Sequence, residues 1–113
     1  MALIEDQAGV EAIEEIVAVP GLDVVFPGPG DLSASMGLLG QPQHPSVQAA
    51  VNRVVEVVRS RPGLVLGYQV MDPAQVGRCQ ELGASIIILS QDTRVVYQAY
   101  RSALAEMRQR LER

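Results

Sequence analysis

The sequence predicts a single α/β domain, because short apolar strands alternate with helical repeats along all 113 residues. Strands are expected near residues 2–5, 22–26, 64–70 and 85–90. The run from Ile86 to Leu89 is apolar at every position, which is typical of a parallel strand buried on both faces. Four consecutive βα units make half of an eight-stranded (β/α)8 barrel, and the alternative is a small doubly wound parallel sheet.

A helical repeat follows each expected strand. The apolar face over residues 10–17 predicts a helix that ends at Pro20, and a short helix is expected after the second strand. The repeat over residues 47–58 predicts a longer helix. The expected caps are Asp72 and Gly83 for the helix after the third strand, and Asp92 or Thr93 for the last helix.

The most informative segment is Gly28-Pro29-Gly30-Asp31, which directly follows the second strand. Its two glycines permit positive φ and let main-chain N–H groups approach a ligand closely. Asp31 can hold a cation or cap a short helix. An ordinary tight turn into a helix has the same composition, so this segment alone leaves both interpretations open.

Glu5 is expected at the carboxyl end of the first strand, on the same rim of the sheet as Asp31. In parallel α/β proteins this rim is where ligands bind. Two carboxylates completed by water molecules suit Mg²⁺ or Mn²⁺, which keep much of their hydration. The alternative is that Glu5 is a solvated strand-end residue and Asp31 only an N-cap.

Composition excludes several classes of function. No run approaches the roughly 18 apolar residues of a membrane span. One cysteine and an N-terminus without a signal-peptide pattern predict a cytoplasmic protein. A net charge of −4, with no basic stripe and only 3 tyrosines and 1 phenylalanine, makes neither a nucleic acid nor a membrane an expected partner.

The basic residues, 9 in number, are all arginine. Without lysine no Schiff base can form on a side chain, so carbonyl chemistry here needs a metal or hydrogen-bond donors to stabilise an enolate. The only histidine, His44, lies between prolines, where capping or loop packing is expected rather than catalysis. No nucleophile elbow supports a Ser-His-Asp triad.

A resemblance to a known family extends along the chain. It is carried by Leu3-Ile4-Glu5, residues 20–26, residues 28–37, residues 43–50, Asp72, residues 81–84 and Asp92-Thr93. On these residues the chain resembles the HpcH/HpaI family of metal-dependent, pyruvate-forming aldolases, which have a TIM (β/α)8 barrel. The match is with the C-terminal half of the barrel, and Gly-Pro-Gly-Asp-Leu-Ser-Ala-Ser is its most specific part.

The resemblance implies a lyase site and a substrate class. Glu5 and Asp31 would hold a divalent metal, magnesium or manganese, that also chelates a 2-oxo acid such as pyruvate. The main-chain N–H groups of Gly30 and Asp31 would receive the carboxylate of this small-molecule substrate. In the family, a general-base histidine and an arginine that holds pyruvate come from the first four strands, which this chain does not match. No catalytic residue is therefore assigned.

Some positions depart from the family pattern. Gly30 stands where alanine is usual, Ser90 and Gln91 replace Gly-Val, and Gln69 lies where an apolar residue is expected against the substrate methyl group. Three hypotheses stay open. The chain is an aldolase or lyase half that works with a complementary N-terminal half-barrel, a metal- and carboxylate-binding module without chemistry, or a structural half-barrel.

A homo-oligomer, most simply a dimer, is also expected, because barrel curvature leaves one face of a four-stranded sheet without helices. Ile4, Val25, Leu66 and Ile87 are expected on that face. In the family a C-terminal helix often packs on a neighbouring subunit. The apolar stripe expected on the last helix is Val96, Tyr100, Ala103, Leu104, Met107 and Leu111.

Overall fold

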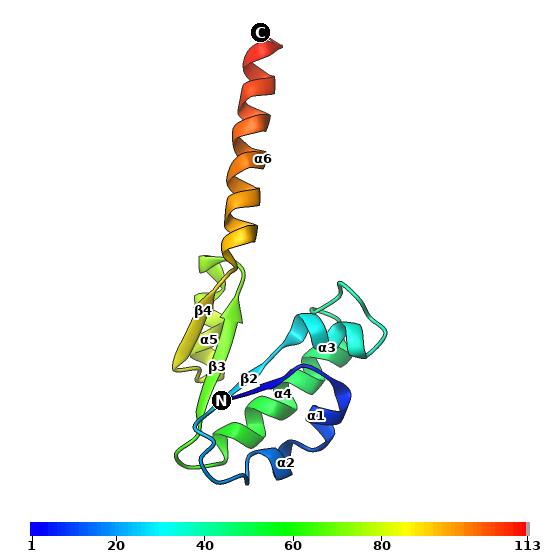
Figure 1. Cartoon of the computed structure of the whole chain (residues 1–113), viewed down its shortest axis with the longest axis vertical. Coiled ribbons are helices and arrows are strands. Elements are labelled where there is room, and N and C mark those ends of the chain that lie inside the picture. The colour runs from blue at the N-terminus through cyan, green and yellow to red at the C-terminus, as the bar shows by residue number, and fades with distance from the viewer. Residues whose placement is uncertain (113) are drawn as a thin grey trace.

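The computed structural model describes residues 1–112, which form a four-stranded sheet, its covering helices and one long projecting helix (Figure 1). The strands are β1 (Ala2–Ile4), β2 (Val24–Pro27), β3 (Val65–Val70) and β4 (Ile86–Leu89). The helices are α1 (Gln7–Glu11), α2 (Ile13–Ile16), α3 (Pro29–Ser35), α4 (Pro45–Arg59), α5 (Val76–Leu82) and α6 (Asp92–Leu111), with a 3-10 turn η1 (Pro73–Gln75) before α5. The strands lie within two residues of their expected bounds.

All strand pairs are parallel, and the order in the sheet is β1-β2-β3-β4. A doubly wound sheet reverses its strand order, whereas sequential order with right-handed crossovers places every helix on one face. The register is also staggered as in a barrel, because β3 pairs with β2 at Val65 and Leu66 and with β4 only from Gly67 onward. The half-barrel prediction is confirmed, and the doubly wound alternative is wrong.

The hydrophobic core lies between the sheet and its helices. Ile4, Val25 and Leu66 are 2%, 0% and 3% exposed and join one cluster with the apolar face of α4. The prediction that these three side chains lie on the helix-free face is therefore wrong. Successive residues of a strand point to opposite faces, so an error of one residue exchanges the two faces. Because nearly every strand position is apolar, the sequence does not show which residues face the helices. The valines that α4 contributes to the core are Val47, Val51, Val54, Val55 and Val58.

The helix-free side of the sheet, the open face, carries the alternate strand residues. Leu3 is 58% exposed there, and Ile86 and Ile88 are also exposed. Ile87, the fourth residue expected on this face, instead pairs in register with the core residue Tyr68. Ile87 is nevertheless 40% exposed, and all four residues of β4 are exposed. The members of the open face are Leu3, Phe26, Gly67, Gln69, Ile86 and Ile88.

Helix ends follow the expected signals at three places and differ at one. His44 caps α4 by accepting a hydrogen bond from the Ser46 N–H (3.3 Å). Asp72 caps η1, and Gly83 ends α5 with a left-handed φ of 76°. At α6 the N-cap is Gln91, which makes no side-chain capping bond, so the prediction of Asp92 or Thr93 as the cap is wrong. The expected first helix is divided into α1 and α2 at Ala12.

Helix α6 projects away from the sheet and contributes no buried residue (Figure 1). The chain therefore measures 62 × 29 × 22 Å, and its radius of gyration of 17.3 Å exceeds the roughly 13 Å of a compact domain of this size. The apolar side chains of α6 are exposed, including Tyr100, Leu104 and Met107. No helix within residues 1–112 combines the length and apolarity needed to cross a bilayer.

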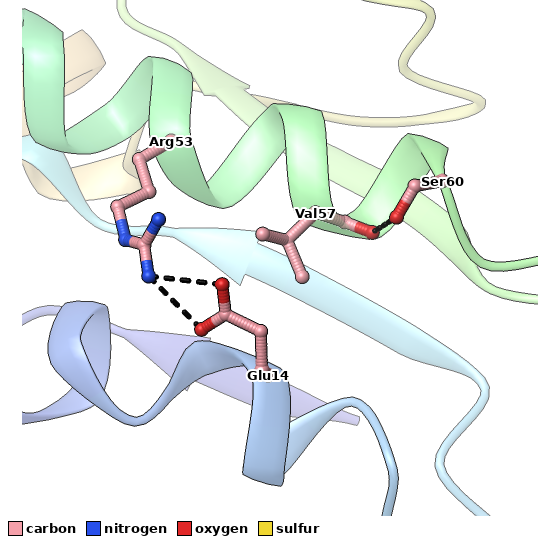
Figure 2. Close-up of polar contacts among 4 residues, drawn as sticks. All are labelled: Glu14, Arg53, Val57 and Ser60. Atoms are coloured by element: carbon pink, nitrogen blue, oxygen red, sulfur yellow. Dashed lines mark hydrogen bonds and ion pairs between the residues drawn. The ribbon is translucent and has the colours of Figure 1, made fainter.

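A surface ion pair joins α2 to α4 on the outer side of the helix layer (Figure 2). Arg53 Nη2 donates to both carboxylate oxygens of Glu14, at 2.9 and 3.0 Å. Both side chains are about half exposed, so the pair contributes at most about 1 kcal/mol. Apolar packing therefore dominates the attachment of α2 to α4.

At the end of α4, Ser60 Oγ donates to the Val57 carbonyl at 2.7 Å (Figure 2).

The close contact of Phe26 with Gly67 gives a direct test of the open face. A Cβ at position 67 would clash with the Phe26 ring, whereas a Cβ at Gly77 in α5 would meet nothing within 4 Å. We expect Gly67→Ala to destabilise the fold by about 1–3 kcal/mol through overpacking. The matched control Gly77→Ala should stabilise it by up to about 1 kcal/mol through helix propensity. Urea unfolding measures both, and equal effects of the two substitutions would contradict this packing.

Candidate functional site

The carboxyl ends of β1, β2 and β3 border a cavity of about 720 Å³. Glu5 enters it from the end of β1, and Gly28 to Asp31 from the end of β2 and the start of α3. Gln69 and Arg78 line it from β3 and α5. The cavity thus lies at the rim where strand ends meet helix beginnings, which is the usual position of a ligand site in parallel α/β folds.

Glu5 is positioned by the pairing of β1 with β2. The register sets Ile4 opposite Pro27, and the next residue, Gly28, donates its N–H to the Ile4 carbonyl at 2.8 Å. A Cβ on Gly28 would lie 3.0 Å from the Glu5 Cβ and 3.5 Å from its Oε2. A glycine at this position therefore allows the main chain to pass close to the Glu5 side chain.

Asp31 lies in the first turn of α3. Gly28 is the N-cap of this helix with φ −108°, and Pro29 occupies its first turn. The positive φ that Gly28 and Gly30 permit is not used by either residue, and the alternative that Asp31 is only an N-cap is wrong. The first N–H groups of a helix have no partner within it, so those of Gly30 and Asp31 are available to a ligand. Gly30 has open space around its Cα, so alanine would fit there.

The two predicted metal ligands, Glu5 and Asp31, line the same cavity. Within residues 1–112, no hydrogen bond or ion pair engages either carboxylate. The same part of the chain holds no cluster of three or more His, Cys, Asp or Glu residues around one point. Two carboxylates completed by water fit a hydrated Mg²⁺ or Mn²⁺ and do not fit Zn²⁺, which prefers several nitrogen or sulfur ligands.

Tyr68 and Arg78 line the cavity and were not found by sequence reasoning. Burial raises the pKa of the Tyr68 phenol, and the nearby Arg78 guanidinium opposes part of this rise. Arg78 also contacts Glu81 (3.3 Å) and Asn52 (3.5 Å). Their sequence signal was weak, because Tyr68 belongs to an apolar strand and Arg78 to an ordinary amphipathic helix. The phenol stays protonated at neutral pH and offers a hydrogen-bond donor.

Gln69 and Ser90 occupy the ends of β3 and β4. Gln69 lines the cavity, and its Nε2 donates to the Ser90 carbonyl at 3.2 Å. Ser90 has a left-handed φ of 52°, and its N–H donates to the Val70 carbonyl at 2.6 Å. The Ser90 hydroxyl is buried without a hydrogen-bond partner among the described residues. These two positions, singled out above as departures from a family pattern, are therefore in contact.

The remaining nucleophilic and basic candidates lie away from the cavity lining. His44 caps α4, as expected. Cys79 is fully buried in the core, and burial raises the pKa of its thiol. A buried thiol with a raised pKa is a poor nucleophile.

A staggered parallel half-barrel whose carboxyl rim borders a cavity is typical of the (β/α)8 barrel class of enzymes. Residues 1–99 match the family model of the HpcH/HpaI aldolase/citrate lyase family, and the chain belongs to this family.

Relatives in this family cover most of the chain. A hydroxypyruvate/pyruvate aldolase of Paraburkholderia phytofirmans is 39% identical over 105 residues, which are 93% of this chain and 40% of the relative. A 2-keto-3-deoxy-L-rhamnonate aldolase of Klebsiella pneumoniae is 34% identical over 90% of this chain and 38% of the relative. The chain therefore spans about 40% of the length of the curated relatives that it matches.

Solved structures agree with the fold. An HpcH/HpaI aldolase/citrate lyase family protein from Burkholderia cenocepacia superposes with a TM-score of 0.83 at 38% identity, over 94% of this chain and 41% of that chain. The citrate synthase SbnG superposes with a TM-score of 0.89 at 31% identity, over 98% of this chain and 45% of that chain. Both matches extend over nearly the whole sheet and its helices.

Proposed function

We propose that this chain forms the metal-binding half of a divalent-metal-dependent aldolase that acts on 2-oxo acids. The observation that carries the proposal is the cavity shared by Glu5, Asp31 and the first turn of α3. Glu5 and Asp31 would hold Mg²⁺ or Mn²⁺, and the N–H groups of Gly30 and Asp31 would bind the substrate carboxylate. When bound, the cation supplies Lewis-acid stabilisation of developing enolate charge.

The absence of lysine from the sequence supports a metal-dependent route. A side-chain imine cannot form on this chain, so the groups that this chain can offer to stabilise an enolate are a bound cation and the hydrogen-bond donors of the rim. Relatives named as aldolases of 2-oxo acids act on substrates of the proposed class. The buried, unpaired Cys79 fits a reducing compartment, and the cytoplasm is the proposed location.

A complementary N-terminal half-barrel is the proposed catalytic partner. The matched relatives are more than twice as long as this chain, and the open face presents apolar residues that the rest of a barrel would cover. The general base and the pyruvate-holding arginine would come from that half.

A second copy of this chain is the other proposed partner. Both sides of β4 are exposed, and α6 presents an apolar stripe without a partner within residues 1–112. The α6 stripe of one copy would cover β4 of the other, and the reciprocal contact would form at the same time. Such self-complementary exchange favours a two-fold dimer.

The metal proposal predicts the effect of removing each carboxylate charge. Mn²⁺ is titrated calorimetrically into the wild type, Glu5→Gln, Asp31→Asn and the control Glu11→Gln, whose carboxylate lies on α1 outside the cavity lining. Either cavity substitution is expected to weaken Mn²⁺ binding at least tenfold, because each removes one of two anionic ligands. The control should bind as the wild type does. Unchanged affinity in both cavity variants would refute the site.

The aldolase proposal predicts activity by complementation. Residues 1–113 alone are expected to release no appreciable pyruvate from a 4-hydroxy-2-oxo acid with Mn²⁺. Co-expression with the N-terminal half of the Paraburkholderia aldolase should restore cleavage, and Asp31→Asn should abolish it. Turnover of the isolated chain above about 1 s⁻¹ would contradict the assignment of the base to the other half. A folded complex that binds Mn²⁺ but never cleaves would favour a binding module.

The oligomer proposal predicts a mass that depends on α6. Light scattering at micromolar concentration is expected to give a dimer, and Leu104→Glu should shift it toward monomer by placing a charge in the apolar contact. Gln98→Glu, on the same helix outside the stripe, is the control and should stay dimeric. A wild-type monomer whose unfolding does not depend on concentration would overturn the proposal.

A further inference from the structure

The amide of Gln69 is a polar group on an otherwise apolar surface. It lies on the open face of β3, in register with Ile88 of β4, and it lines the cavity that contains Glu5 and Asp31. Its strand neighbours Tyr68 and Val70 point to the opposite side, where they join the core. Gln69 itself lines the cavity and is not a member of the core cluster, so its amide faces the candidate site and the core does not require it.

The orientation of this amide is fixed by its partner. The Ser90 carbonyl can only accept, so the amide nitrogen must face it, at 3.2 Å, and Oε1 must face away. The main chain of Ser90 is fixed in turn, because its N–H donates to the Val70 carbonyl. Its φ is 52°. A residue in this left-handed conformation costs about 1 kcal/mol or more and persists only where its surroundings hold it. Gln69 is thus pre-oriented by the end of β4.

The consequence is a fixed hydrogen-bond acceptor on the cavity wall. Within residues 1–112, Gln69 Oε1 accepts no hydrogen bond, and the side chain is half-buried. An acceptor in such a place is satisfied by water or by a ligand that donates, and a ligand that displaces the water without donating loses a hydrogen bond. A methyl group would be such a ligand, whereas a hydroxyl group would restore the bond.

The strand order places this acceptor beyond the proposed carboxylate position. Along the rim, Glu5 follows β1, Gly30 and Asp31 follow β2, and Gln69 belongs to β3. A 2-oxo acid held by its carboxylate at the start of α3 would extend toward β3, because Glu5 closes the β1 side of the cavity and the cation would lie between Glu5 and Asp31. The carbon next to the keto group then lies on the Gln69 side.

We infer that Gln69 is a specificity-determining residue that selects 2-oxo acids carrying a hydroxyl group on the carbon next to the keto group. The hydroxyl donates to Gln69 Oε1, and Ser90 acts as the residue that positions the amide. This inference rests on the proposed function, since it needs the metal and carboxylate sites to place the acid. It adds a substrate preference that the carboxylates alone do not determine.

Ligand binding to the full chain tests the inference without requiring turnover. Hydroxypyruvate and pyruvate are titrated calorimetrically at saturating Mn²⁺, with water-proton relaxation as a separate readout of bound Mn²⁺. The wild type is expected to prefer hydroxypyruvate about fivefold, the effect of one neutral hydrogen bond. Gln69→Leu should lose this preference while its affinity for pyruvate stays the same. Gln91→Leu, which alters another glutamine of the cavity lining, should keep the preference.

A second measurement needs no variant. In the wild type, the side-chain amide resonances of Gln69 are expected to shift on addition of hydroxypyruvate and not on addition of pyruvate. Equal binding of the two acids, or a preference that survives Gln69→Leu, would overturn the role of Gln69 while leaving the proposed function intact. Bound Mn²⁺ with neither acid binding, both in the chain alone and in its complex with the N-terminal half of the Paraburkholderia aldolase, would overturn the proposed function, and the inference with it.

Discussion

The parallel pairing of β1 with β2 is the constraint on which the candidate site depends. The Gly28 N–H bonds to the Ile4 carbonyl at 2.8 Å, one residue before Glu5, and α3 begins immediately afterwards at Pro29. These contacts bring one carboxylate from each strand end to one cavity, together with the free N–H groups of a helix start. A side chain at Gly28 would press on Glu5, so the glycine is required by contact and not by an unusual φ.

The two faces of the sheet have different physical roles. The covered face packs Val25 and Leu66 against α4 and supplies the apolar burial that stabilises the fold. The open face carries Gln69, which lines the cavity, and leaves apolar side chains such as Leu3 exposed. Under the proposed function, substrate binding and association would share one surface, since a partner that covers the open face would also enclose the cavity.

Strand positions, the half-barrel topology and the caps at Asp72 and Gly83 could be predicted from local signals. The sequence could not predict which strand residues face the helices, because apolar residues on both faces leave no alternation of polar and apolar positions. The conformation of Gly28 could not be predicted, because glycine permits either sign of φ and α3 begins directly at Pro29. The Gln69 to Ser90 contact joins two strands and has no local signal, although both residues stood out from the family pattern.

The position of the metal is the central claim, and paramagnetic broadening by Mn²⁺ tests it most directly. Substoichiometric Mn²⁺ added to ¹⁵N-labelled protein should first remove the amide signals of Gly28, Gly30 and Asp31. The signals of α2, whose Glu14 and Glu15 form the competing acidic surface, should persist. Broadening that begins at α2 and spares the start of α3 would contradict the account.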